Sequence, residues 1–217
     1  MDAGRRGSSR VRQGRLVTVG PSFPRNPFSS PHSLKNRLAR ALWQLVWLTL
    51  FRPSPRVFHG WRRLLLRSFG AKLGRGVHVY PSAKVWAPWN LEMGHHSCLG
   101  PCVDCYNVDR VKLGEFSTVS QYSYLCTATH NYQDLSMPLI TKPIELGARS
   151  WIAADVFVGP GVCIGEGAVV GARSAVFRDV EPWTVVGGNP ARFLKRRELQ
   201  SGKGVRLDAS ADPVARG

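Results

Sequence analysis

Aliphatic residues recur every six positions over residues 146–181. They form one column: Leu146, Ile152, Val158, Ile164, Val170 and Val176. Glycine or alanine directly follows the first five members of the column, and a small or β-branched residue lies four positions after every member. A period of six matches neither the 3.6-residue turn of an α-helix nor the alternation of a strand, so it indicates an internal repeat.

This repeat predicts a coil of short parallel strands. Each six-residue unit supplies one flat side, its aliphatic residue points to the axis, and the small residue and the glycine permit the turn into the next side. Three sides complete one coil, and stacked coils bury a continuous apolar column. We therefore predict an all-β fold, a parallel β-helix.

The same period begins upstream at Leu73 and slips by two residues twice, at residues 91–92 and 111–112. A coil tolerates such slips at its corners, where the backbone can bulge without disturbing the axis. The register then breaks over residues 131–145, which contain Pro138 and Pro143. We predict that this segment is a loop leaving the coil, and loops of this kind usually carry function.

The residues before the repeat predict two helices. Ser33 is a suitable N-cap for a helix that runs toward residue 51 and stops before Pro53, and a second helix is expected over residues 57–69. Both contain tryptophan and leucine among basic residues, so residues 33–72 are predicted to form an amphipathic helical hairpin. Such a hairpin lies on a membrane face or packs on the coil and caps its end, and both alternatives remain open.

The formal net charge of +16 is concentrated at the N-terminus, where residues 1–72 hold fifteen Lys or Arg against one acid, Asp2. This charge favours contact with an anionic surface such as lipid headgroups. No recognised motif for reading nucleic acid accompanies it, so nucleic acid is not the expected partner. We expect residues 1–32 to be a disordered basic tail, residues 73–191 the β-helix domain, and residues 192–217 a basic C-terminal tail.

The cysteines bear on compartment and on metal binding. Five cysteines, an odd number, favour a reducing compartment, and the first apolar run, residues 41–51, is too short to span a bilayer. The protein is therefore expected to be cytoplasmic, and the membrane alternative for the hairpin would add peripheral contact at the inner membrane face. Cys102 and Cys105, with Cys98 and the histidines at 95 and 96 nearby, suggest zinc. Because no second CxxC follows and Cys105 occupies an axis position, we expect no metal.

Several segments carry a family resemblance. They are the six-residue repeat, Cys-Thr-Ala-Thr-His at residues 126–130, the excursion after it, Trp-Ile-Ala at 151–153, and Val-Gly-Gly-Asn-Pro-Ala-Arg at 186–192. Together they resemble the hexapeptide-repeat, left-handed β-helix acyltransferases, and most closely the O-acetyltransferases of colanic acid and exopolysaccharide biosynthesis. The resemblance covers roughly residues 34–197. It implies a left-handed coil and a homotrimer whose active sites lie between chains.

The resemblance also implies an activity, the transfer of an acetyl group from acetyl-CoA to a sugar hydroxyl without a metal. His130 matches the general base of the family, and the backbone N–H of Ala154 matches the donor to the tetrahedral oxyanion. Coenzyme A would lie in a groove between chains. The matching cofactor-binding positions are Trp151 and Ala154 near the thiol, Ala172 along the arm, and Arg178, Arg192 and Lys195 toward the phosphates.

On the acceptor side, Asp104, Asn107 and Asp109 precede His130 by one coil and are expected to hydrogen-bond the hydroxyls of a saccharide, either free or lipid-linked. Related sugar acetyltransferases carry an acidic residue at the position that matches Asn107. An alternative from a different class is a non-catalytic, membrane-associated β-helix scaffold that recruits partners through its basic face.

Overall fold

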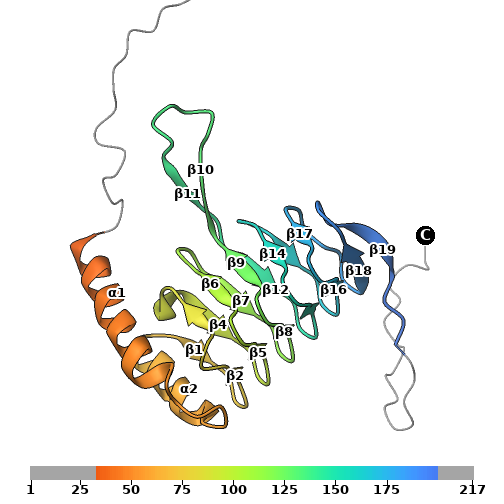
Figure 1. Ribbon diagram of the computed structural model, residues 1–217. Coiled ribbons are helices and arrows are strands. Elements are labelled where there is room, and N and C mark those ends of the chain that lie inside the picture. The colour runs from red at the N-terminus through yellow and green to blue at the C-terminus, as the bar shows by residue number, and fades with distance from the viewer. Residues whose placement is uncertain (1–32, 200–217) are drawn as a thin grey trace, which may run out of the picture. The chain divides into compact units, whose positions relative to one another are not determined.

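Stacked coils of short parallel strands form the body of the protein (Figure 1). The structure, a computed structural model, describes residues 33–199; the predicted tail at residues 1–32 and residues 200–217 lie outside this range. Most strands fall into three sheets, one for each side of the coil, and these sheets are parallel except at the last strand of the second. The prediction of a β-helix made of hexapeptide repeats is confirmed.

The first sheet contains β1 (Lys72–Leu73), β4 (Leu91–Met93), β7 (Val111–Leu113), β12 (Ile144–Leu146) and β15 (Cys163–Ile164). The second contains β2 (His78–Val79), β5 (Cys98–Leu99), β8 (Thr118–Val119), β13 (Trp151–Ile152), β16 (Val169–Val170), β18 (Thr184–Gly187) and β19 (Arg192–Arg196). The third contains β3 (Lys84–Val85), β6 (Asp104–Tyr106), β9 (Tyr124–Cys126), β14 (Phe157–Val158) and β17 (Ala175–Val176). We call the turns between the sheets the first corner (first to second sheet), the second corner (second to third) and the third corner (third sheet to the next coil).

The six-residue column forms the core, as predicted. Its members from Val79 onward are almost completely buried, and each pairs with the equivalent residue of a neighbouring coil. Leu146, for example, pairs with Leu113 on one side and Ile164 on the other, so the column continues across the excursion between them. The two slips precede Met93 and Leu113, where Leu91 and Val111 are buried as well.

The glycines after the column residues allow the backbones of neighbouring coils to lie close together, and they are less important for the turn itself. A Cβ on Gly94 would lie 2.7 Å from the backbone nitrogen of Glu115 in the next coil, a distance that real Cβ atoms do not adopt. The left-handed turn at this first corner comes two residues later, at His96 (φ 55°) and at the equivalent Phe116 (φ 57°). The sequence interpretation assigned the turn to the small residue and the glycine of each unit, whereas the structure places it two residues after the glycine, where Gly76 and Gly167 occupy the equivalent positions of other coils.

Two helices cover the open end of the first coil (Figure 1). They are α1 (Leu34–Val46), which continues as a π-helical turn η1 (Trp47–Phe51), and α2 (His59–Ser68); a short 3₁₀ turn, η2 (Pro88–Asn90), follows β3. The Ser33 hydroxyl accepts a hydrogen bond from the Asn36 N–H at 3.3 Å, so the predicted N-cap is present. Among residues 33–199, none of the helices has the length and apolar character needed to cross a bilayer.

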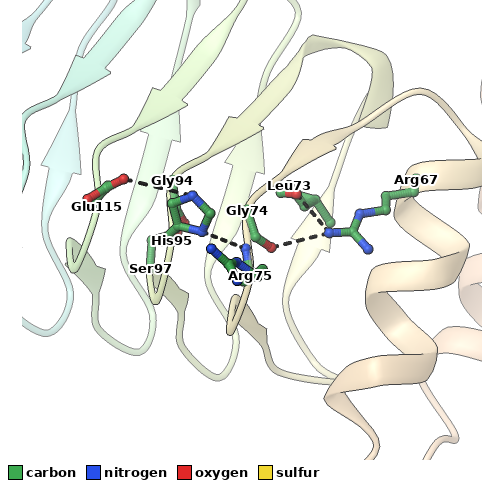
Figure 2. Close-up of polar contacts among 8 residues, drawn as sticks. All are labelled: Arg67, Leu73, Gly74, Arg75, Gly94, His95, Ser97 and Glu115. Carbon is green, nitrogen blue, oxygen red and sulfur yellow. Dashed lines mark hydrogen bonds and ion pairs between the residues drawn. The ribbon is translucent and has the colours of Figure 1, made fainter.

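Side chains from these helices satisfy backbone carbonyls at the exposed edge of the coil. Trp43 Nε1 donates to the carbonyl oxygen of Val85 at 2.7 Å, and the buried Arg62 Nε donates to that of Val79 at 2.6 Å. Figure 2 shows Arg67 of α2 donating to the carbonyl oxygens of Leu73 and Gly74. An uncovered edge would offer these groups to another chain, so the helices act as the cap that a solenoid requires.

The predicted excursion is a β-hairpin that projects from the third corner (Figure 1). Its strands, β10 (Ala128–His130) and β11 (Leu139–Thr141), pair antiparallel. The coil resumes at Ile144, one residue before the end of the loop predicted over residues 131–145, because Ile144 pairs with Val111 and returns to the core.

Candidate active site

The hairpin presents His130 to solvent in one fixed orientation. The backbone of His130 pairs with Leu139, and its ring nitrogen Nδ1 lies 2.6 Å from the carbonyl oxygen of Met137. A carbonyl oxygen only accepts hydrogen bonds, so we assign the proton of the neutral ring to Nδ1. The exposed ring therefore has its other nitrogen, Nε2, free to accept a proton.

Ala154 and Ala172 line a shallow hollow at the second corner. The hollow has a volume of about 400 Å³ and is lined by Tyr122, Ala154, Asp155, Ala172 and Arg173. Both alanines are small enough to leave room for a ligand along the corner. Within residues 33–199, the backbone N–H of Ala154 has no hydrogen-bond partner, so it is available to an incoming oxygen atom.

Trp151 lies on β13, just before this corner. Its side chain is half exposed, and its Nε1 donates to the Ser120 hydroxyl at 2.9 Å. This hydrogen bond holds the indole against the neighbouring coil, so its outer face is presented to solvent in a defined orientation.

Two of the three predicted phosphate-binding cations share a larger hollow at the last coil. This hollow, with a volume of about 740 Å³, includes Arg178 and Arg192 in its lining, whereas Lys195 lies on the exposed strand β19 nearby. Among the described residues, neither Arg178 nor Arg192 forms an ion pair, while Arg196 in the same hollow pairs with Glu181 at 3.2 Å. The two unpaired guanidinium groups are thus available to an anionic ligand.

One chain does not bring His130 and the alanine hollow together. The hairpin that carries His130 leaves from the third corner, whereas Ala154 and Ala172 lie at the second, with the third sheet between them. A site that uses both groups therefore needs a second copy of the chain.

The three predicted acceptor residues have different environments. Asp104 lies on the third sheet 3.9 Å from Lys84 Nζ; burial raises the pKa of its carboxyl group, and Lys84 opposes that rise. The backbone N–H of Asp109 donates to the Thr127 hydroxyl at 2.9 Å, which places Asp109 at the base of the hairpin.

Asn107, in contrast, is completely buried. Its side-chain oxygen accepts hydrogen bonds from the N–H groups of Trp86 and Ala87, and its side-chain nitrogen donates to the Ala87 carbonyl oxygen at 2.6 Å. These contacts favour a structural role for Asn107 at the third corner.

Several residues of the site were not singled out from the sequence. The Met137 carbonyl, which orients His130, is a backbone group, and any residue at that position would supply it. Tyr122, Asp155 and Arg173 occupy equivalent positions at the second corner of successive coils, so Tyr122 and Arg173 line the alanine hollow on either side of Asp155. Counting positions at each corner of the six-residue repeat would have brought Tyr122, Asp155 and Arg173 together.

The cysteine and histidine cluster near residues 95–105 is not arranged as a metal site. Cys105 points to the axis, and its burial raises the pKa of its thiol, while Cys102 is exposed. His95 Nδ1 accepts a hydrogen bond from the backbone N–H of Arg75 at 2.9 Å (Figure 2). Within residues 33–199, no group of three or more His, Cys, Asp or Glu side chains is positioned to hold a metal ion.

Three-sided coils built on a six-residue repeat define the class of β-helix proteins made of hexapeptide repeats. No protein-family model matches the sequence. Over 172 residues the chain is 42% identical to an Escherichia coli K12 protein named "Putative colanic acid biosynthesis acetyltransferase WcaF", and the match covers 78% of this chain and 94% of that protein. Over 123 residues it is 43% identical to a chloramphenicol acetyltransferase of Escherichia coli, covering 47% of this chain and 59% of that one.

Solved structures show the same relationship. A hexapeptide-repeat acetyltransferase from Vibrio cholerae superimposes with a TM-score of 0.70 at 27% identity, covering 76% of this chain and 94% of that one. The same protein has been solved in complex with acetyl coenzyme A. The chain therefore belongs to the hexapeptide-repeat acetyltransferases, in the family of the colanic acid biosynthesis acetyltransferase. This membership confirms the predicted class of enzyme and does not support the scaffold alternative.

Proposed function

We propose that this protein transfers an acetyl group from acetyl-CoA to a hydroxyl of a saccharide used in exopolysaccharide biosynthesis. The name of the Escherichia coli relative supports the pathway, and the acetyl coenzyme A complex of the Vibrio cholerae protein supports the donor. The observation that carries the chemistry is the contact between His130 Nδ1 and the Met137 carbonyl, since it leaves Nε2 as an exposed base.

In this mechanism, Nε2 of His130 removes the proton from the acceptor hydroxyl as the hydroxyl oxygen attacks the thioester carbon. The unpartnered N–H of Ala154 donates to the oxyanion that forms. The intermediate then collapses, the carbon–sulfur bond breaks, and the imidazolium returns its proton to the departing coenzyme A sulfur. The proton taken from the hydroxyl ends on the coenzyme A sulfur, so the reaction balances in protons and charge without a metal ion.

Acetyl-CoA would extend from the Ala154 N–H along the coil toward its last turn. Trp151 and Ala154 would contact the thiol end, Ala172 would give room to the pantetheine arm, and Arg178, Arg192 and Lys195 would attract the phosphates. The two unpaired arginines of the last coil support this direction, because Arg binds phosphate with two parallel hydrogen bonds. Asp104 and Asp109 would hydrogen-bond the saccharide.

We further propose that the enzyme is a homotrimer. Because His130 and Ala154 lie at different corners of one coil, a cyclic arrangement that places the third corner of one chain beside the second corner of the next would complete each site. Three identical sites would result.

The test is substitution of the base in a thiol-release assay with acetyl-CoA and a panel of saccharides, with chloramphenicol added as an acceptor. His130→Ala is expected to lower kcat by about 10² to 10⁴ while coenzyme A binding and the molecular mass in solution stay the same. His96→Ala is the matched control, because His96 is an exposed histidine at the first corner. Full activity of the His130→Ala variant would refute the assignment.

A further inference from the structure

Helix α1 has a second apolar face that no described residue covers. Trp43 points to the coil, whereas Leu34, Leu38, Leu42 and Leu45 are between 56% and 68% exposed. Spacings of four, four and three residues place these leucines on one stripe of the helix. A single exposed leucine is ordinary, but a contiguous stripe marks a docking surface.

The stripe continues into an apolar groove between η1 and α2. Thr49 joins the two, since its hydroxyl donates to the Leu45 carbonyl at 2.8 Å and its side chain lines the groove. The groove has a volume of about 680 Å³, and Trp61 is held at its wall by a hydrogen bond from Nε1 to the Leu50 carbonyl at 3.1 Å. We call the whole area the outer apolar surface: Leu34, Leu38, Leu42, Leu45, Leu48, Leu50, Phe58, Trp61 and Leu64.

The charge around this surface has one sign. Residues 33–72 contain nine Lys or Arg and no Asp or Glu. At about 100° per residue along α1, Lys35 and Arg37 fall on opposite borders of the leucine stripe. Both side chains are exposed, and within residues 33–199 neither forms an ion pair. An apolar stripe with cations along both borders is the pattern of a helix that lies in a membrane interface.

We infer that the outer apolar surface docks on an anionic lipid bilayer, with the leucines entering the acyl boundary and the cations contacting lipid headgroups. Charge complementarity selects this occupant. A second copy of the chain would bring a further set of cations against the first, and a nucleic acid would leave the leucines in water. The inference concerns a surface at the capped end of the coil and does not depend on the acetyl-transfer reaction.

The test measures partition of the full chain onto vesicles by sedimentation, without substrates. The vesicles are pure phosphatidylcholine, or phosphatidylcholine with about one third phosphatidylglycerol. We expect binding to the anionic vesicles that weakens with added salt. Leu38→Gln with Leu42→Gln is expected to lower the partition coefficient about tenfold or more, and Lys35→Gln with Arg37→Gln to lower it on anionic vesicles only.

The matched control is Leu194→Gln with Leu199→Gln, which changes two exposed leucines at the other end of the coil and is expected to bind as the unchanged protein does. Equal binding of the Leu38/Leu42 variant and the unchanged protein would overturn the inference. So would a Leu38/Leu42 variant that alters the molecular mass in solution but not vesicle binding, because the surface would then be an interface between copies.

Discussion

At Met137 the backbone adopts a positive φ of 43°, and the carbonyl oxygen of this residue lies against Nδ1 of His130. This contact determines which ring nitrogen of His130 carries the hydrogen. With the opposite tautomer, Nε2 would carry the hydrogen and could not remove a proton from an acceptor. The hairpin thus supplies both the catalytic candidate and the hydrogen bond that prepares it.

The sequence could single out His130 as the candidate base but not the state of its ring. His130 was found through the residues around it, which resemble a known family, whereas its partner is a carbonyl group common to every residue. Asn107 shows the reverse difficulty. Its place on the coil preceding His130 suggested contact with the acceptor, but only coordinates reveal that its amide holds the backbone of residues 86 and 87.

At the residue scale, Asp104→Asn separates stability from function. Burial raises the folded-state pKa of Asp104 above its unfolded value, so the ionised form opposes folding at neutral pH. This opposition disappears as the pH falls through the folded-state pKa. The variant should therefore be slightly more stable at pH 7, by less than about 1 kcal/mol because the carboxyl group is nearly half exposed, with no gain at acidic pH.

If Asp104 hydrogen-bonds the saccharide, the same variant should raise the KM for the acceptor about two- to tenfold and leave that for acetyl-CoA unchanged. Thermal unfolding across pH and steady-state kinetics measure the two effects. A loss of stability at pH 7 would contradict the stated effect of burial.

At the scale of elements, the six-residue period predicted the strands well because each axis position has only one inward direction. The hairpin was predicted as a loop, since its antiparallel pairing depends on contacts that leave no period in the sequence. The helices were also predicted, but their pattern of apolar and basic residues fitted both a membrane face and the end of the coil as the packing partner. Hydrogen bonds from Trp43 and Arg62 to the coil show the capping contact, and the outward leucines leave the membrane contact as a prediction.

The contribution of α1 to the cap can be measured at Trp43. This side chain is buried against Phe51 and Phe69 and donates a hydrogen bond to the edge of the coil. Trp43→Ala should lower the free energy of unfolding by about 3–5 kcal/mol. Trp43→Phe should lower it by about 1–3 kcal/mol, because the Val85 carbonyl loses its partner.

Leu42→Ala is the control for this series, since its side chain is exposed on the same helix, and it should change the stability by no more than about 0.5 kcal/mol. Urea unfolding measures all three variants. Equal stability of the Trp43→Ala and Leu42→Ala variants would mean that α1 does not hold the coil.

For the whole molecule, the separation of His130 from Ala172 predicts complementation between two inactive chains. His130→Ala removes the base, and Ala172→Trp fills the hollow at the second corner. If each site combines the two corners from different chains, an equal mixture assembled together should recover activity at about one quarter of its sites.

Native mass spectrometry would establish that the two variants assemble together, and thiol release would measure the recovered activity. Mixed assemblies that remain as inactive as either parent would show that each site is built within one chain.

The strand β19 has a consequence for how the molecule avoids becoming a filament. Every other strand of the second sheet runs parallel to its neighbour, so the next coil could be supplied by another molecule. β19 runs in the opposite direction along β18, and a bulge between Val185 and Val186 further disturbs the pairing. Because the final strand is reversed, the second sheet offers no parallel edge to a coil from another molecule. The stack of coils therefore ends within a single chain.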